Sequence, residues 1–146
     1  MEASKHRYLI ALGSNRRAPQ IGAPRAVLDA AVAELAEEGW EVEAVSSWVD
    51  SAPIGPSQRQ YANGAVVIGG DLDPTETLEH LQSIEEKFGR ERRGQRWRSR
   101  TLDLDIVLWS GGAWHSTTLS IPHPLCHHKM NLIIIVHIRL VFKESA

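Results

Sequence analysis

Residues 100–109 read RTLDLDIVLW, and apolar and polar side chains alternate through most of this stretch. Successive side chains of a β-strand point to opposite faces of a sheet, so the alternation predicts a strand with one face toward a core. The other face would carry Asp103 and Asp105, two carboxylates on an otherwise apolar strand. The face toward the core would be wholly aliphatic and consist of Leu102, Leu104, Ile106 and Leu108.

Two carboxylates this close repel each other unless a cation lies near them. Mg²⁺ is a hard ion that proteins hold with one or two carboxylates together with substrate phosphates. Asp103 and Asp105 therefore predict a magnesium site. The alternative for this pattern alone is a half-exposed strand with solvated acids.

Three further strands and two helices are predicted. Apolar runs bounded by glycine and proline predict strands over residues 7–12, 40–49 and 61–70. Apolar residues at helical spacing predict helices over 24–38 and 74–89. The second helix has a strong start, with Asp73 as N-cap, Pro74 at the first position and Glu76 completing a capping box.

The predicted order is strand, helix, strand, strand, helix, strand. This order is typical of the α+β, ferredoxin-like βαββαβ fold, in which an antiparallel sheet carries its helices on one face. The other face of the sheet is then available for a functional site. Residues 1–146 are expected to form one domain with a C-terminal extension over 125–146.

Composition narrows the class of protein. With 42% hydrophobic and 23% charged residues, the 146-residue chain reads as globular, and its net charge of −2 predicts no general attraction to nucleic acid or membrane. A single cysteine excludes an intrachain disulfide. The first residues do not resemble a signal peptide, and the apolar run over 132–142 is too short to span a bilayer. We expect a cytoplasmic monomer.

An arginine-rich segment precedes the acidic strand. Planar guanidinium groups suit phosphate oxygens, so a dense cluster of them predicts contact with an anion. Together with a metal-type acid pair, such a cluster indicates phosphoryl transfer. The alternatives are a solvated basic loop or a nucleic-acid patch in which Trp97 stacks on bases. The cluster consists of Arg90, Arg92, Arg93, Arg96, Arg98 and Arg100.

Other polar side chains are weaker candidates. Tyr61 and Asn63 share a strand face after a proline-containing loop and suit a flat heterocycle, although taken alone they are better explained by core packing of Tyr61 and a turn role of Asn63. Gln82 and Glu85 lie on neighbouring turns of the second helix. His123 lies between two prolines and suits a phosphate contact. A zinc site formed with Cys126, His127 and His128 is a weaker alternative, since the spacing matches no standard finger.

Four segments in this order resemble the 6-hydroxymethyl-7,8-dihydropterin pyrophosphokinase family of folate biosynthesis, over about residues 7–124. They are ALGSN (11–15), PIGPSQRQYANGAV (53–66), RWRSRTLDLDI (96–106) and IPHP (121–124). The resemblance implies a ferredoxin-like fold. It also implies transfer of the β,γ-pyrophosphoryl group of ATP to the hydroxymethyl group of a reduced pterin, with release of AMP and with two Mg²⁺ ions. ATP and the pterin would be its partners, without nucleic acid or membrane.

The resemblance also implies roles for individual residues. The two Mg²⁺ ions would be held by Asp103 and Asp105. The phosphates and the catalytic loop would involve Arg90, Arg92, Arg93 and Arg100. The ATP site would include Gln82, Glu85, Arg96, Ser120, His123 and Lys129. The pterin site would include Ser51, Ala52, Ile54, Tyr61, Asn63 and Trp97.

The sequence departs from the family pattern in two places. Ser51 and Ala52 stand where the family more often has threonine and proline. After residue 124, Lys129 stands about where the family has an arginine, and Asn131 about where it has an aromatic residue. Because an amide cannot stack as a ring does, we expect weakened pterin binding. The alternatives are a member with impaired or no turnover that binds ATP or pterin, and a nucleic-acid binder that uses the arginine segment.

Overall fold

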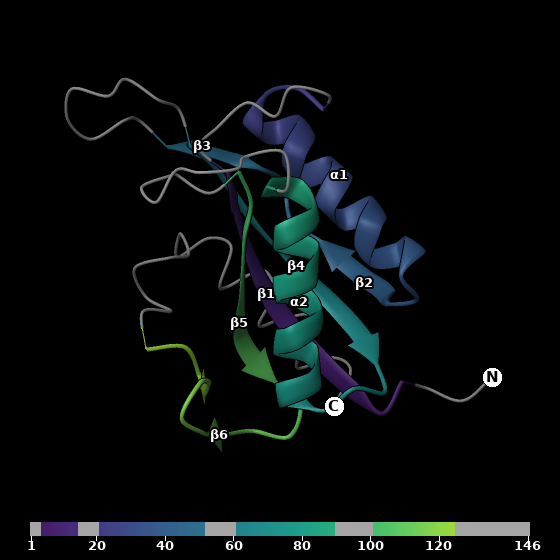
Figure 1. The fold of residues 1–146 in the computed structure, drawn as a ribbon, viewed down its shortest axis with the longest axis vertical. Helices are drawn as coiled ribbons and strands as arrows, with labels where there is room; N and C mark the ends of the chain where they lie inside the picture. The colour runs from purple at the N-terminus through teal and green to yellow at the C-terminus, as the bar shows by residue number, and fades with distance from the viewer. Residues whose placement is uncertain (1–3, 15–20, 52–60, 90–100, 125–146) are drawn as a thin grey trace.

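The computed structural model describes residues 4–14, 21–51, 61–89 and 101–124 (Figure 1). The elements are, in chain order, β1 (His6–Ser14), α1 (Pro24–Glu37), β2 (Glu41–Val45), β3 (Val49–Ser51), β4 (Tyr61–Gly70), α2 (Pro74–Gly89), β5 (Asp103–Trp109), β6 (Trp114–His115) and β7 (Ser120–Ile121).

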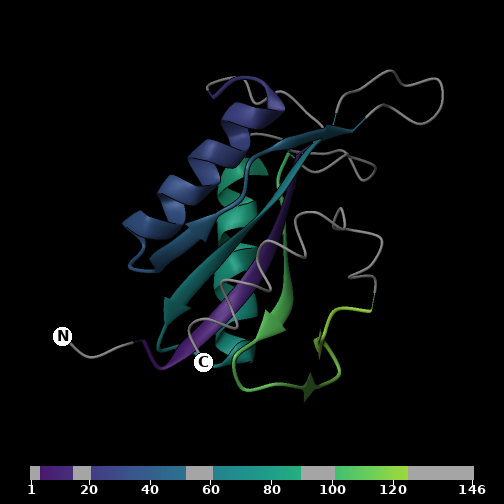
Figure 2. The same cartoon turned by 180° about the vertical axis from the view of Figure 1, so that it is seen from behind.

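A single antiparallel sheet forms the centre of the molecule. Its strand order is β2–β4–β1–β5, and β3 pairs with the first residues of β4. Both helices lie against the same face, as Figure 1 shows from the helix side and Figure 2 from behind. This is the predicted ferredoxin-like arrangement, and the α+β fold class is confirmed.

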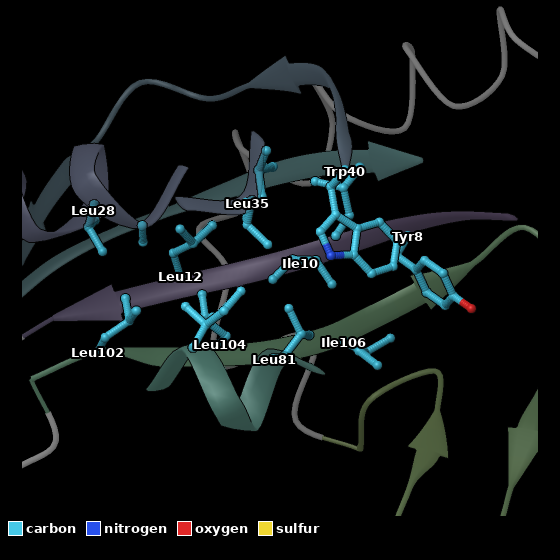
Figure 3. Close-up of a cluster of buried hydrophobic side chains, with 14 of the residues drawn as sticks. Tyr8, Ile10, Leu12, Leu28, Leu35, Trp40, Leu81, Leu102, Leu104 and Ile106 are labelled. Carbon is cyan, nitrogen blue, oxygen red and sulfur yellow. The ribbon is translucent and has the colours of Figure 1, made fainter. Parts of the chain in front are cut away.

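The main core lies between the helices and the sheet. Tyr8, Ile10 and Leu12 of β1 point into it, and Leu81 of α2 and Leu28 of α1 cover them, all at most 2% exposed (Figure 3). A second, smaller apolar cluster contains no helix residue and therefore lies on the opposite face of the sheet. Its buried members are Leu9, Ala11, Ala65, Val67 and Val107.

Local sequence signals determine where the helices begin and end. In α2, Asp73 Oδ1 accepts a hydrogen bond from the Glu76 N–H at 2.9 Å, and Glu76 Oε1 accepts one from the Asp73 N–H at 3.2 Å. The predicted capping box is therefore confirmed. In α1, Pro24 occupies the first position, and Gly39 follows the helix with a φ of 99°, a conformation that glycine adopts without strain.

The stretch 40–49 was predicted as one strand but forms parts of two, β2 and β3, which both pair with β4. The interruption is at Ser46. Its side-chain oxygen accepts a hydrogen bond from the Ala65 N–H at 2.9 Å, and its N–H donates to the Ala65 carbonyl at 2.9 Å. A side chain thus replaces a backbone acceptor at this point, and the regular ladder is broken.

A bulge in β5 changes which side chains of this strand face the main core, compared with the prediction. Leu9 of β1 pairs with Leu108 and Ile10 pairs with Ile106, so Val107 is an extra residue on β5. The prediction is right for Leu102, Leu104 and Ile106, which belong to the main core. It is wrong for Leu108, which packs with the cluster on the opposite face, whereas Trp109 packs against the main core.

A small hairpin of β6 and β7 follows β5 and was not predicted. Each strand has two residues, too few for a periodic signal, and Trp114 pairs with Ile121. After it, the Ile121–Pro122 peptide bond is cis, and the chain returns to β5 at His123. Within the described ranges, no helix is long and apolar enough to cross a membrane.

Candidate functional site

The two aspartates of β5, Asp103 and Asp105, lie on the sheet face away from the helices. Asp103 pairs with Gly13 of β1, and Asp105 pairs with Ala11, a member of the cluster on that face. Leu104, between them, points into the main core. Asp103 is exposed and the Asp105 side chain is 30% exposed. The expectation that both carboxylates share one accessible face is confirmed.

Gly13 separates a carboxylate from an amide. It pairs with Asp103 on one side and with Asn63 of β4 on the other, so the three residues form a row across adjacent strands. Adjacent strands lie about 4.8 Å apart, and side chains at paired positions point to the same face. A Cβ added at Gly13 would lie only 3.3 Å from Asn63 Oδ1. The missing side chain leaves bare backbone between Asn63 and Asp103.

His123 approaches the acid pair from the segment after β7. Its N–H donates a hydrogen bond to the Val107 carbonyl at 3.1 Å, which anchors this segment along β5. Its Nε2 then lies 4.0 Å from Asp105 Oδ1, and the side chain is 20% exposed. When the imidazole is protonated, this contact is an ion pair. The structure therefore brings a predicted phosphate contact next to a predicted metal ligand.

Glu85 reaches the acid strand from α2. Its carboxylate accepts a hydrogen bond from the Leu104 N–H at 3.2 Å. Among the strands described here, β5 pairs only with β1, so backbone groups on its other side can bind partners outside these strands, as the Val107 carbonyl does with the His123 N–H. Glu85 binds one of these groups and fixes α2 against β5. Gln82, one turn earlier on α2, is exposed.

The residues expected at a pterin lie at the start of β4. Tyr61 pairs with Ser51 of β3, and Asn63 pairs with Val49. Tyr61 and Asn63 lie two residues apart in one strand and thus share a face, as expected. Tyr61 is 41% exposed, so a core-packing role does not account for it. These positions and Asp103 are at the same end of the sheet.

Ser120 lies apart from the row formed by Asn63, Gly13 and Asp103, on strand β7 of the small hairpin. Its Oγ is 3.0 Å from His115 Nδ1, across the β6–β7 pair. The other predicted site residues lie outside the described ranges: Ala52, Ile54, Arg90, Arg92, Arg93, Arg96, Trp97, Arg100 and Lys129. The same holds for Arg98, Asn131 and the zinc alternative at Cys126, His127 and His128.

The donor chemistry of the acid pair fits Mg²⁺. Two carboxylates on one accessible strand face are the kind of ligands with which proteins hold Mg²⁺ together with substrate phosphates. Among the described residues, no group of three or more histidine, cysteine, aspartate or glutamate side chains is arranged to hold a metal ion.

Two site features were missed by sequence reasoning. Gly13 was read only as the end of a strand, and its place between Asn63 and Asp103 depends on strand pairing. The contact of Glu85 with the Leu104 backbone joins residues 19 apart along the chain. Neither relationship has a local signal, although the glycine in ALGSN after a buried strand was an available hint.

Comparison with known proteins agrees with this geometry. The sequence model of the 7,8-dihydro-6-hydroxymethylpterin-pyrophosphokinase family matches residues 9–138, which extends the likeness beyond residue 124. A protein of Synechocystis sp. is 39% identical over 130 residues, covering 88% of this chain and 64% of its own length. A Haemophilus influenzae protein is 36% identical over 86% of this chain and 76% of its own.

A third relative, from Bacillus subtilis, is 40% identical over 83% of this chain and 70% of its own length. All three relatives are named 2-amino-4-hydroxy-6-hydroxymethyldihydropteridine pyrophosphokinase. The family match covers most of the chain, including the row formed by Asn63, Gly13 and Asp103. This chain belongs to the 7,8-dihydro-6-hydroxymethylpterin-pyrophosphokinase family.

Proposed function

We propose that this chain transfers the pyrophosphoryl group of ATP to 6-hydroxymethyl-7,8-dihydropterin in folate biosynthesis. The hydroxymethyl oxygen forms a bond to the β-phosphorus of ATP and loses its proton. The bond from the β-phosphorus to the oxygen shared with the α-phosphate breaks, and AMP leaves. The observation that carries the proposal is the row Asn63–Gly13–Asp103, which supports it because an amide suited to a heterocycle and a carboxylate suited to a metal flank the same glycine.

Asp103 and Asp105 would hold two Mg²⁺ ions together with the phosphates. When bound, Mg²⁺ neutralises negative charge on the transferred group. His123, 4.0 Å from Asp105, would orient that carboxylate or contact a phosphate oxygen. Glu85 would keep the backbone between the two aspartates in place through its hydrogen bond to the Leu104 N–H. Gln82, Ser120, Arg96 and Lys129 would complete the ATP side.

The pterin side would begin at β4. The Asn63 amide has both a donor and an acceptor and suits the hydrogen-bonding edge of a pterin. Tyr61 is exposed beside it and offers a ring face. Ser51, Ala52, Ile54 and Trp97 would add further contacts. Bare backbone at Gly13 lets the ring lie between Asn63 and the metal ligands, so that the hydroxymethyl group approaches the phosphates.

The arginines would supply positive charge where the transferred group develops negative charge. This role is proposed for Arg90, Arg92, Arg93 and Arg100. The protein thus acts mainly by positioning two substrates and by electrostatic stabilisation. We propose that it works as a monomer. The alternatives of a nucleic-acid binder and of an inactive family member gain no support from the relatives, which are named as pyrophosphokinases.

AMP release tests the function directly. With ATP and Mg²⁺, AMP should form only after 6-hydroxymethyl-7,8-dihydropterin is added. Asp103→Ala and Asp105→Ala should each lose several kcal/mol of charge stabilisation, roughly a hundredfold or more in rate, with an unchanged circular dichroism spectrum. Asp71→Ala, which changes a carboxylate beyond the far end of β4, is the matched control. Pterin-independent AMP formation, or full activity of Asp103→Ala, would contradict the proposal.

A further inference from the structure

The first turns of α1 are bonded to β3 by a forked ion pair. Arg25 Nε donates to Asp50 Oδ1 at 3.0 Å and to Oδ2 at 3.1 Å, and Arg25 Nη2 donates to Oδ2 at 2.9 Å. The same Nη2 donates to the Trp48 carbonyl at 3.3 Å. One side chain of α1 therefore contacts two of the residues that lead into and form β3.

Trp48 makes a second link between the same elements. Its indole Nε1 donates to Asp29 Oδ1 of α1 at 2.7 Å. Its ring lies on Gly64 of β4, where an added Cβ would be 2.2 Å from Trp48 Cε3. The indole thus fills the space that any side chain at position 64 would need. Gly64 directly follows Asn63, so this contact is next to the predicted pterin residue.

β3 is a short strand. It has three residues, and its pairing with β4 consists of Val49 with Asn63, Asp50 with Ala62, and Ser51 with Tyr61. So short a strand gains little stability from its own pairing, and contacts from outside the sheet add to the packing of Val49 against the second apolar cluster. Arg25 and Trp48 provide them on both sides of Val49, the residue opposite Asn63.

We propose that Arg25 is a positioning residue for the pterin side of the site, acting through Asp50 and Trp48. It holds β3 against β4, so that Ser51, Tyr61 and Asn63 keep the places in which they meet the ring. The inference rests on the proposed pyrophosphokinase function. Arg25 is not among the residues proposed to contact either substrate, and the ATP side is proposed on other elements, β5 and α2.

The expected effect is selective and modest. Arg25 and Asp50 are 56% and 48% exposed, and exposed ion pairs are screened by water and salt. Arg25→Ala should therefore leave the fold intact and raise the KM for the pterin by about threefold to fivefold, with little change in the KM for ATP. Arg25→Lys keeps the charge but loses the fork, so it should fall between wild type and Arg25→Ala.

A charge swap and a second arginine provide the controls. Either single change, Arg25→Asp or Asp50→Arg, should raise the KM for the pterin. The double variant with both changes should bring this KM part of the way back toward the wild-type value. Arg7→Ala removes another ion pair of the same sheet, Arg7 Nε to Glu43 at 2.6 Å, at the opposite end of β1 from Gly13. That pair is the less exposed of the two, so its loss should lower stability at least as much and leave the pterin KM unchanged.

The possible outcomes separate this inference from the function on which it rests. A wild-type chain that forms no pterin-dependent AMP overturns the proposed function and the positioning role with it. Normal wild-type turnover, with equal pterin KM for wild type and Arg25→Ala, overturns only the positioning role. The positioning role is also overturned if Arg25→Ala and Arg7→Ala raise the KM for the pterin equally. A general loss of stability would then explain the effect.

Discussion

The Glu85 carboxylate accepts a hydrogen bond from the Leu104 N–H at 3.2 Å, and Leu104 is the residue between the two aspartates. A side chain of α2 thereby fixes β5 at the point where the sheet face away from the helices carries the predicted metal ligands. The backbone between Asp103 and Asp105 cannot shift along the edge without breaking this bond. The placement of the acid pair is therefore coupled to the packing of α2.

Glu85→Ala should weaken both stability and turnover. It leaves the Leu104 N–H without its carboxylate acceptor, and hydrogen bonds to charged groups contribute about 1.5–3 kcal/mol. We expect urea denaturation to show a loss of about 1.5 kcal/mol in the free energy of unfolding. Glu85→Gln keeps an oxygen acceptor and should lose less. Glu86→Ala changes the exposed neighbouring carboxylate and should resemble wild type; equal losses at 85 and 86 would argue against a specific role.

Gly13→Ala should weaken pterin binding. The new Cβ would lie 3.3 Å from Asn63 Oδ1, closer than most contacts of this kind, so the amide must move. Loss of its alignment should raise the pterin dissociation constant at least about fivefold, roughly 1 kcal/mol, in calorimetry.

Gly69→Ala is the control for this change. Gly69 also lies on β4, six residues after Asn63, and an added Cβ there would meet the Ser4 side chain near the start of the described chain, at 2.8 Å. It should therefore leave pterin affinity unchanged. If Gly13→Ala bound pterin as tightly as wild type, the absence of a side chain at Gly13, between Asn63 and Asp103, would have no role in admitting the ring.

The ion pair of Arg25 with Asp50 predicts a dependence of stability on pH. The hydrogen bonds from Arg25 lower the pKa of Asp50 in the folded protein. A carboxyl group with a lowered folded pKa contributes stability above its unfolded pKa, about 3.9, and loses it as pH falls toward the folded pKa. The stability difference between wild type and Asp50→Asn should therefore be constant above about pH 5 and shrink below about pH 4.

Chemical denaturation at several pH values measures this difference. Raising the salt concentration should reduce it at neutral pH, because the pair is exposed. A difference that grows as the solution becomes more acidic would contradict the assigned sign.

Sequence reasoning reached the parts of the fold that depend on neighbours in the chain. The capping box of α2 joins Asp73 to Glu76, and strand β4 was predicted with its observed bounds. The features of the fold that were not predicted depend on residues far apart along the chain. The bulge at Val107 follows from register with β1, and the break at Ser46 follows from its bonds to Ala65.

The candidate site likewise has features with a local sequence signal and features that depend on residues far apart along the chain. The shared face of Asp103 and Asp105 follows from strand alternation alone. The contact of His123 with Asp105 follows from the path of the β6–β7 hairpin, which has no periodic signal. Periodicity thus predicts which faces carry the site, whereas the row through Gly13 and the position of Glu85 require the three-dimensional pairing of strands and helices.

Tyr8 predicts a second pH dependence, at the alkaline end. Its ring is fully buried in the main core, and its hydroxyl donates to the Leu72 carbonyl at 2.6 Å. Burial raises the pKa of Tyr8 to about 12. Because this pKa is above the unfolded value of about 10, the folded protein binds the proton more tightly, and stability falls as pH rises from about 10 to about 12. The loss should approach about 2 kcal/mol.

Tyr8→Phe removes both the hydrogen bond and the ionisable group. At pH 7 the variant should be less stable than wild type by about 1 kcal/mol, because the Leu72 carbonyl loses a donor. Above about pH 11 the order should reverse, since only wild type must then bury a group that tends to ionise. Denaturation curves of the two proteins from pH 7 to 12 test this crossing. Parallel curves over the whole range would show that ionisation of Tyr8 is not linked to unfolding.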